Sequence, residues 1–179
     1  MTGRIVIVTG PPAAGKSTLA RALAREADGL LAVHMHSDDF YAYIAKGYVE
    51  PWRAESRDQN TVVVEALAAS AVRFAQGGYL VAMDGVIGPW FLDPWRAAGR
   101  RVPVDYVVLM PDAQSNLARF TGREDHPLQD ATVVEQMWQA FTAHRAGYEP
   151  HMLDTTGQDA AESLAALRAG LAEGRFRLS

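Results

Sequence analysis

The sequence predicts an α/β fold, a three-layer sandwich in which helices cover both faces of a five-stranded parallel sheet. Short apolar runs rich in β-branched residues alternate with longer segments of helical periodicity, and this alternation is typical of βαβ units. The chain has 179 residues, close to one domain at roughly 150 residues per domain. We therefore expect a single domain over residues 1–179.

The composition excludes several classes of protein. The net charge is −4, which argues against a nucleic-acid polymer or an anionic membrane as partner. The chain has no cysteine, so disulfides, thiolate metal sites and cysteine nucleophiles are excluded. No apolar run approaches the roughly 18 residues that span a bilayer, and we expect no signal peptide. These observations predict a cytoplasmic protein, either a monomer or a homodimer.

The first strand and the first helix are the clearest elements. Residues 5–8 read Ile-Val-Ile-Val, the continuous apolar run of a strand that is buried on both faces. A helix is expected over 18–27, because apolar residues such as Leu19 and Leu23 recur four positions apart. The Asp-Gly pair at 28–29 ends it.

The remaining elements repeat this order. A long helix over 59–76 is closed by a Gly-Gly pair. Shorter apolar runs predict further strands over 31–35, 79–83, 104–110 and, more weakly, 151–153. Periodic segments predict further helices over 112–120, 131–147 and 159–173. In parallel sheets, ligands bind beyond the carboxyl ends of the strands, so polar residues at those ends form the candidate site.

A phosphate-binding loop joins the first strand to the first helix. Residues 10–17 read Gly-Pro-Pro-Ala-Ala-Gly-Lys-Ser and match G-x-x-x-x-G-K-[ST] between a strand and a helix, as that motif requires. Glycines let the backbone amides converge on phosphate oxygens, and the helix adds its free amides. Lys16 would reach the β- and γ-phosphates, and Ser17 would ligate Mg²⁺. The predicted nucleotide-binding residues here are Gly10, Ala13, Ala14, Gly15, Lys16, Ser17 and Thr18.

Carboxylates follow the second and third strands at the same edge of the sheet. Asp38 and Asp39 follow the second strand, where a carboxylate would accept the proton of an attacking hydroxyl or hold Mg²⁺ through water. Either would also serve as a helix N-cap, and we assign the catalytic role to Asp38 with Asp39 as the alternative. Asp84 ends an apolar run, as a Walker-B carboxylate does, although Asp84-Gly85 is also a turn-forming pair. The predicted metal ligands are Ser17 and Asp84.

Two arginines and two threonines follow the fourth and fifth strands. Arg119 and Arg123 would share one helix face if the helix continues, and on a lid over about 119–130 they would neutralise a transferring phosphoryl group. Arg119 would also contact the nucleotide. A solvated charged turn is the alternative. Thr155 and Thr156 would hydrogen-bond the base directly or through their backbone, and an ordinary β-to-α turn explains them equally well.

Aromatic residues gather in the segments after the second and third strands. These residues are Phe40, Tyr41, Tyr43, Tyr48 and Trp52, followed by Trp90, Phe91 and Trp95. Their faces suit a ring, a base or an apolar antibiotic, and Arg53 or Arg57 would pair with an acidic group. The alternative is that the rings seal an acceptor-binding helical region over about 38–60. His34 and His36 lack an evident third ligand, so we do not assign them to a metal.

Five features together resemble the small P-loop metabolite kinases, among them shikimate kinase, gluconate kinase and chloramphenicol phosphotransferase. They are the P-loop, Asp38, the pair Asp84-Gly85, the R-x-x-x-R pattern from Arg119 to Arg123, and the Asp-Thr-Thr turn at 154–156. The resemblance implies the strand order 2-3-1-4-5, ATP with Mg²⁺ as donor, and Asp38 as base. The chain lacks the D-x-D and triple-glycine motifs of shikimate kinase and the acceptor signature of gluconate kinase.

The sequence thus predicts an ATP-dependent phosphotransferase that moves the γ-phosphate to a hydroxyl of a small molecule: a sugar acid, a cyclic metabolite or an antibiotic. Lys16, Asp38, Arg119 and Arg123 would be its catalytic residues. One alternative is a nucleoside or polynucleotide 5′-hydroxyl kinase. A second is a nucleotide-dependent regulatory module without acceptor chemistry, which would hydrolyse ATP slowly and capture a partner.

Overall fold

One parallel sheet of five strands organises the molecule. A computed structural model describes residues 3–27, 29, 31–122 and 131–178. Its strands are β1 (Arg4–Thr9), β2 (Ala32–His36), β3 (Leu80–Asp84), β4 (Val104–Leu109) and β5 (Met152–Leu153). They lie in the order β2-β3-β1-β4-β5, and every pair is parallel. The predicted fold class and strand order are confirmed, and each predicted strand boundary is within one residue of the observed one.

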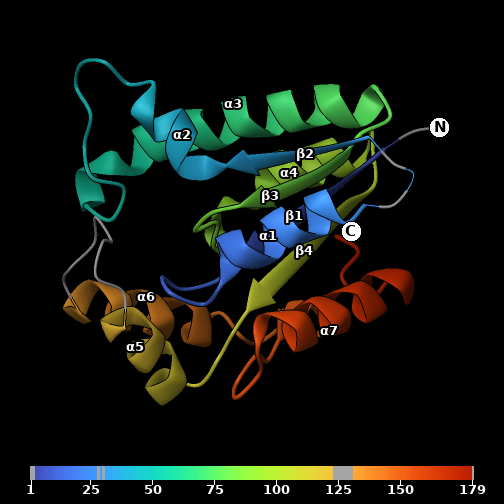
Figure 1. The fold of residues 1–179 in the computed structure, drawn as a ribbon. Helices are drawn as coiled ribbons and strands as arrows, with labels where there is room; N and C mark the ends of the chain where they lie inside the picture. Colours follow the sequence, from blue (N-terminus) through green and yellow to red (C-terminus); the bar gives the residue numbers. More distant parts are fainter. Residues whose placement is uncertain (1–2, 28, 30, 123–130, 179) are drawn as a thin grey trace.

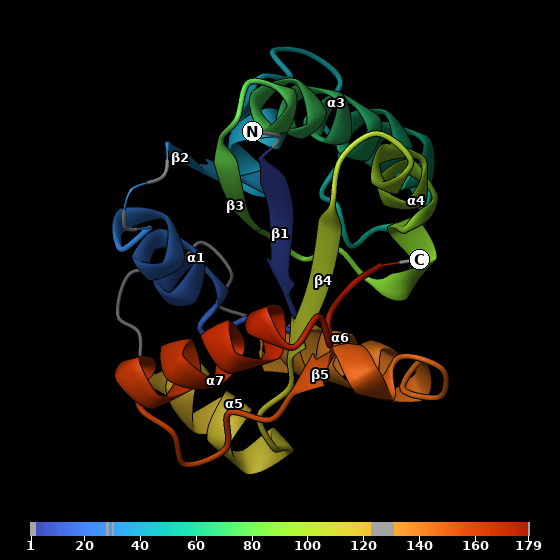
Figure 2. The ribbon, with the colours of Figure 1, turned by 90° about the vertical axis from the view of Figure 1, so that its right-hand side faces the viewer.

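Helices cover both faces of this sheet (Figures 1 and 2). The helices α1 (Lys16–Arg25) and α7 (Ala160–Ala172) pack on one face, and α3 (Arg57–Gln76) and α4 (Asp93–Gly99) pack on the other. Ile5 and Ile7 of β1 belong to the core under α3 and α4, whereas the intervening Val6 and Val8 belong to the core under α1 and α7. Both faces of β1 are therefore buried, which explains its uninterrupted apolar sequence.

Two further helices lie at the end of the molecule where the P-loop is found. The helices α5 (Ala113–Thr121) and α6 (Ala131–Ala143) pack against each other beyond β4 (Figure 1). Phe120 of α5 and Val134 of α6 form a small buried cluster with Ala13 of the P-loop. The P-loop is thereby packed against α5 and α6, the two helices that adjoin the lid predicted over about 119–130.

The structure contains short elements that the sequence did not predict. These are α4 and the 3₁₀ turns η2 (Pro89–Phe91) and η3 (Glu149–His151), whereas α2 (Ser37–Ala42) and the 3₁₀ turn η1 (Ala54–Ser56) fall in the region over about 38–60 that was expected to be helical. In the region 38–60, expected to be helical, residues 43–53 form no helix. Gln59 of α3 holds this segment, because its side chain bonds the Val49 amide at 2.9 Å and the Val49 carbonyl at 2.7 Å. In the part of the chain described, no helix is long and apolar enough to cross a bilayer.

Candidate active site

The loop between β1 and α1 has the backbone geometry of a phosphate cradle. Gly10 and Gly15 have positive φ angles of 140° and 96°, and Ala13 has a φ of 67°. Ala13 is the one non-glycine residue with positive φ among those described, and a left-handed alanine costs roughly 1–2 kcal/mol. Strain of this kind gathers at ligand clamps, and the packing of Ala13 against Phe120 and Val134 holds it in place.

The start of α1 is left open for an anion. Its N-cap is Gly15, no side chain caps it, and its first turn contains no acidic residue. The first amides of a helix lack intrahelical partners, and the dipole of the helix places partial positive charge there. Gly10 brings the loop close to β4, because a Cβ at this position would lie 2.3 Å from the Leu109 carbonyl oxygen. The predicted loop residues thus form a site shaped for phosphate.

Asp84 connects the P-loop to β2. It is fully buried at the end of β3, and Ser17 Oγ donates a hydrogen bond to its Oδ2. His34 Nε2 lies 2.5 Å from Oδ1, and His36 Nδ1 lies 2.9 Å from Oδ2. Burial alone would raise the pKa of Asp84, but the hydrogen bonds from His36, Ser17 and His34 outweigh it and hold the pKa below its usual value. Asp84 is therefore an ionised carboxylate at neutral pH.

The two predicted metal ligands, Ser17 and Asp84, lie in direct contact. Mg²⁺ takes oxygen ligands, and in nucleotide sites it usually has one or two carboxylates plus phosphate oxygens and water. The described residues include no group of three or more His, Cys, Asp or Glu arranged to hold a metal by themselves. One hydroxyl and one buried carboxylate beside a phosphate loop fit this type of Mg²⁺ site.

His36 joins Asp84 to the predicted base, Asp38. Its Nε2 lies 3.3 Å from Asp38 Oδ2, while its Nδ1 contacts Asp84. Hydrogen bonds to Asp38 and Asp84 raise the pKa of His36 to about 10. The hydrogen bond from His36 is also the largest cause that lowers the pKa of Asp38, and the charge of Lys16 adds to it. The lowered pKa keeps Asp38 ionised at neutral pH. Its side chain is 75% exposed and is therefore open to a second substrate.

Asp39 differs from its neighbour. No hydrogen bond or ion pair involves its side chain in the described structure, whereas Asp38 is held by His36 and by Ser37 Oγ at 3.0 Å. Ser37 packs against Gly85, where a Cβ would lie 2.1 Å from Ser37 Oγ. Gly85 therefore lets the start of α2 approach the end of β3. These contacts favour Asp38 over Asp39 as the working carboxylate.

Sequence reasoning missed the two histidines. They stand at alternate positions of β2, which places both on one side of that strand, and β2 pairs with β3 so that His36 is opposite Asp84. The predicted strand order and this alternation are the two sequence features from which the contact between the histidines and Asp84 could have been predicted. The two histidines are not a metal pair that lacks a third ligand: in the structure both rings contact the carboxylate of Asp84.

The arginine segment is only partly described. Arg119, in α5, donates to the Thr155 carbonyl at 2.7 Å and to the Gln158 carbonyl at 3.2 Å, so its side chain holds α5 to the loop that follows β5. The helix α5 ends at Thr121, before Arg123, and Arg123 lies outside the described residues together with most of the predicted lid. The predicted role of Arg123 and the shared helix face stay predictions.

Thr155 and Thr156 lie where the sequence placed them, in the loop after β5. Thr155 is buried, and its hydroxyl accepts a hydrogen bond from Arg119 at 3.2 Å. The Thr156 hydroxyl accepts from the Asp112 amide at 2.8 Å. Both hydroxyls therefore hold the loop against α5, and the predicted contact of Thr155 and Thr156 with a base stays a prediction.

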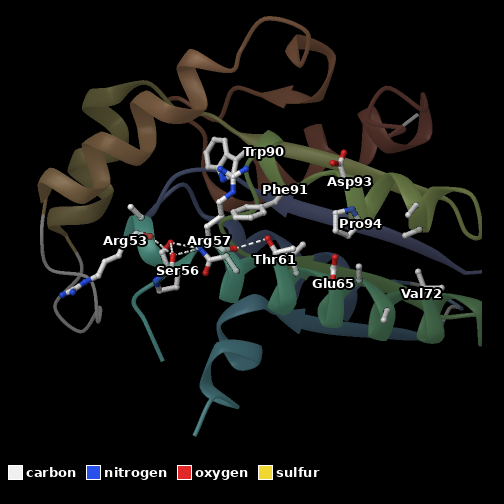
Figure 3. Close-up of a pocket in the computed structure, with 18 of the residues that line it drawn as sticks. Arg53, Ser56, Arg57, Thr61, Glu65, Val72, Trp90, Phe91, Asp93 and Pro94 are labelled. Atoms are coloured by element: carbon white, nitrogen blue, oxygen red, sulfur yellow. Dashed lines mark hydrogen bonds between the residues drawn. The ribbon is translucent and has the colours of Figure 1, made fainter. Parts of the chain in front are cut away.

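A groove opens between α3 and α4 (Figure 3). Its volume is about 940 Å³, and Arg57, Asn60, Trp90 and Phe91 are among the residues that line it. Burial is the main cause that raises the pKa values of Tyr41, to about 12, and of Tyr48, and the charge of Asp38 contributes to both shifts. Arg57, Trp90 and Phe91 thus come together in this groove, whereas Asp38 is not among its described lining residues and Trp95 is buried in the core. The predicted contact of aromatic residues with an acceptor stays a prediction.

Solved structures with this fold include several kinases. A sugar kinase from Janibacter sp. HTCC2649 superimposes with a TM-score of 0.68 at 20% identity, covering 95% of each chain. A gluconokinase from Sinorhizobium meliloti 1021 gives 0.67 at 18% identity, covering 97% of this chain and 94% of the other. Shikimate kinase from Acinetobacter baumannii, in complex with shikimate, gives 0.62 at 23% identity over the same shares. These similarities confirm the predicted resemblance at the level of the fold.

A relative in sequence carries a different name. A tRNA dimethylallyltransferase from Methylobacterium sp. (strain 4-46) is 34% identical over 104 residues, which is 58% of this chain and 32% of the relative. The chain thus spans about a third of the length of that protein. The family described as AAA domain matches residues 6–139, from β1 to the middle of α6. Because this match covers well over half of the chain, the protein belongs to the AAA-domain family.

Proposed function

We propose that the protein transfers the γ-phosphate of ATP to a hydroxyl group of a small molecule. The observation that carries this proposal is the continuous chain of contacts from Ser17 through Asp84 and His36 to Asp38. One end of this chain of contacts is Ser17, at the start of α1, and the other is the exposed carboxylate of Asp38. A nucleotide switch without acceptor chemistry has no need of such a carboxylate.

Each residue has a defined part in the proposed reaction. The amides at the start of α1 and the Lys16 ammonium bind the phosphates, and Ser17 and Asp84 hold Mg²⁺, which when bound neutralises charge on the phosphate oxygens. Asp38 orients the acceptor hydroxyl and takes its proton. The acceptor oxygen forms a bond to the γ-phosphorus as the bond to the β–γ bridging oxygen breaks, which leaves ADP. Arg119, fixed on the loop after β5, belongs to the nucleotide side.

The names of the similar structures support the choice of a small acceptor. Three of them are called a sugar kinase, a gluconokinase and a shikimate kinase. At identities below 25% these structures show only that the fold is shared, so the small acceptor stays a proposal, supported by the exposed carboxylate of Asp38. The curated relative's name points instead to tRNA, and the net charge of −4 argues against a polyanion.

The direct test measures ADP release from Mg·ATP with a library of hydroxylated metabolites and antibiotics, with tRNA as a separate arm. We expect low basal hydrolysis, and release that rises at least about tenfold with one chemical class of small acceptor. A rise with tRNA alone, abolished by salt, favours a nucleic-acid kinase. Slow hydrolysis that no compound stimulates favours a regulatory module and contradicts the proposal.

A further inference from the structure

Both ring nitrogens of His36 face a carboxylate that the proposed reaction uses. Nδ1 lies 2.9 Å from Oδ2 of Asp84, at the predicted Mg²⁺ site, and Nε2 lies 3.3 Å from Oδ2 of Asp38, the predicted base. A ring nitrogen that faces an ionised carboxylate donates its N–H, because the carboxylate can only accept. His36 therefore bridges the two carboxylates, although no step of the proposed reaction uses the histidine itself.

Asp84 does not depend on this bridge for its hydrogen bonds. Ser17 Oγ donates to its Oδ2, and His34 Nε2 lies 2.5 Å from its Oδ1, so each oxygen has a partner without His36. The carboxylate is fully buried, and the strand β3 that carries it is paired on both sides, with β1 and with β2. Asp84 is thus a fixed point of the sheet to which the His36 ring is attached.

Asp38 has the opposite surroundings. Its side chain is 75% exposed, and it belongs to the first turn of α2, a helix of six residues that follows the edge strand β2. Ser37 Oγ, 3.0 Å from Asp38 Oδ1, comes from the same helix and moves with it. The contact of Oδ2 with His36, whose side chain is 26% exposed, joins the carboxylate to the interior of the sheet. Without that contact the Asp38 side chain would exchange between rotamers, as exposed side chains do.

The two contacts still leave Asp38 able to accept a further proton. An ionised carboxylate has about four lone-pair sites, and one donor on each oxygen occupies two of them. The rate of a proton transfer depends on where the base stands, since a displacement of about 1 Å can lower a rate by about 10²-fold. The bridge therefore combines a fixed direction of the carboxylate with free capacity for a hydroxyl group.

We propose that His36 is a positioning residue of the phosphotransfer, which holds the Asp38 carboxylate in place relative to Asp84 so that the acceptor hydroxyl meets the γ-phosphate. This inference rests on the proposed function, because it takes Asp38 as the base and Asp84 as the carboxylate of the Mg²⁺ site. It adds that the base on the acceptor side is aligned from the metal side through one imidazole ring.

Nitrogen-15 NMR of the full chain without nucleotide tests the bridge in solution. The two ring nitrogens of His36, identified by their loss in His36→Gln, are followed through the ring C–H protons, which do not exchange with water. We expect Asp38→Asn to shift the Nε2 signal more than the Nδ1 signal. Asp39→Asn, at the neighbouring exposed carboxylate, should shift neither. Equal shifts in these two variants, or no shift in Asp38→Asn, would overturn the contact and the inference with it.

Two substitutions separate the two contacts of the ring. The amide nitrogen of Asn stands as far along the side chain as Nδ1, and that of Gln stands as far as Nε2. His36→Asn therefore keeps a donor for Asp84, whereas His36→Gln keeps one for Asp38. At saturating Mg·ATP, ADP release should fall about tenfold in His36→Asn and less than about threefold in His36→Gln. Release is measured with the most stimulating compound of the acceptor library and with water alone.

The control measurements distinguish alignment from binding and from folding. Affinity for a non-hydrolysable Mg·ATP analogue should stay within about twofold in both His36 variants, because the phosphate loop is intact. His144→Gln, at an exposed histidine that bonds a carbonyl of its own helix, should change neither rate nor affinity. In the Asp38→Asn background, His36→Asn should lower ADP release no further, because the base that the ring positions is already lost. A residue needed only for folding would add its own loss.

The outcomes separate the inference from the proposed function. A loss of ADP release in Asp38→Asn without a loss in His36→Asn would overturn the inference and leave the phosphotransfer standing. Equal losses in His36→Asn and His36→Gln, or additive losses in the double variant, would do the same. Unchanged release in Asp38→Asn would remove the base itself, and with it both the proposed reaction and the role of His36.

Discussion

The phosphate side and the acceptor side of the molecule are built differently. On the phosphate side, Asp84 is fully buried with three side-chain partners, and the P-loop is held in a strained conformation by packing from α5 and α6. On the acceptor side, residues 43–53 form no helix, and Tyr43 and Trp52 are exposed.

This difference indicates that the phosphate side and the acceptor side have different roles. The phosphate side is organised before any ligand arrives, which suits a donor whose charge must be met by fixed groups. The acceptor side leaves aromatic rings exposed, which suits the recognition of a substrate. Mutations should therefore abolish chemistry on the first side and change substrate preference on the second.

The largest expected effect is that of Lys16→Ala. The ammonium group that would meet the β- and γ-phosphates is lost, so acceptor-stimulated ADP release should fall about 10³-fold. Arg21→Ala is the matched control, because it removes an exposed cation from the same helix and should leave turnover within about twofold. Unchanged turnover in Lys16→Ala would refute the role of the loop.

Asp38→Asn should separate binding from transfer. ATP affinity should remain near normal, while transfer falls roughly 10²-fold because the acceptor proton loses its base. Asp39→Asn, at the neighbouring position without side-chain contacts, should change transfer by less than about threefold. Steady-state rates and a nucleotide titration measure both quantities, and equal loss of affinity and transfer would assign Asp38 to structure or to the metal instead.

Two glycines with positive φ, one on each side, allow the cost of an added methyl group to be compared between the phosphate side and the acceptor side. Gly10→Ala meets the Leu109 carbonyl as well as an unfavourable φ, so the free energy of unfolding should fall by about 3 kcal/mol. Gly47→Ala, in the open acceptor segment, meets no atom within 4 Å and should cost only about 1 kcal/mol. Urea denaturation measures both values, and equal losses would remove the contrast in packing.

The smallest expected effect is a pH dependence of stability from His36. Its pKa is raised in the folded protein to about 10 from 6.5, so its stabilising contribution is complete below pH 6.5 and is lost as the pH rises toward 10. Asp38 and Asp84 act in the opposite direction, because their lowered pKa values stabilise the fold above pH 3.8 and this contribution fades as the pH falls.

His36→Gln therefore should lower the melting temperature by a few degrees at pH 6 and by much less near pH 10. Thermal scans in EDTA buffer check this, with His144→Gln as a control at an exposed histidine that bonds only a helix carbonyl. A deficit that is constant across this range would mean that His36 contributes through packing and not through its charge.

The sequence predicted the parts of the site that are local in the chain. The P-loop is a contiguous motif between a strand and a helix, and Asp84 ends an apolar run, so both could be assigned without tertiary information. The strand order and the five strands followed from the alternation and from the family resemblance. The short helix α4 was missed, because seven residues give too little periodicity to distinguish it from a turn.

The parts that failed depend on contacts between distant segments. His36 reaches Asp84 across 48 positions of the chain, and nothing near His36 in sequence reveals that partner. Likewise, the contacts of the Arg119 side chain with the loop after β5 join residues 36 to 39 positions apart and are seen only in the tertiary structure, while its predicted contact with the phosphates stays a prediction.

Calorimetric titration with a non-hydrolysable ATP analogue measures the central claim most directly. The wild-type chain should bind the analogue in the presence of Mg²⁺, bind it more weakly in EDTA because Ser17 and Asp84 then hold no ion, and show no binding in Lys16→Ala. Absence of binding heat in the wild-type protein, or the same affinity in Lys16→Ala, would contradict a nucleotide site at the start of α1.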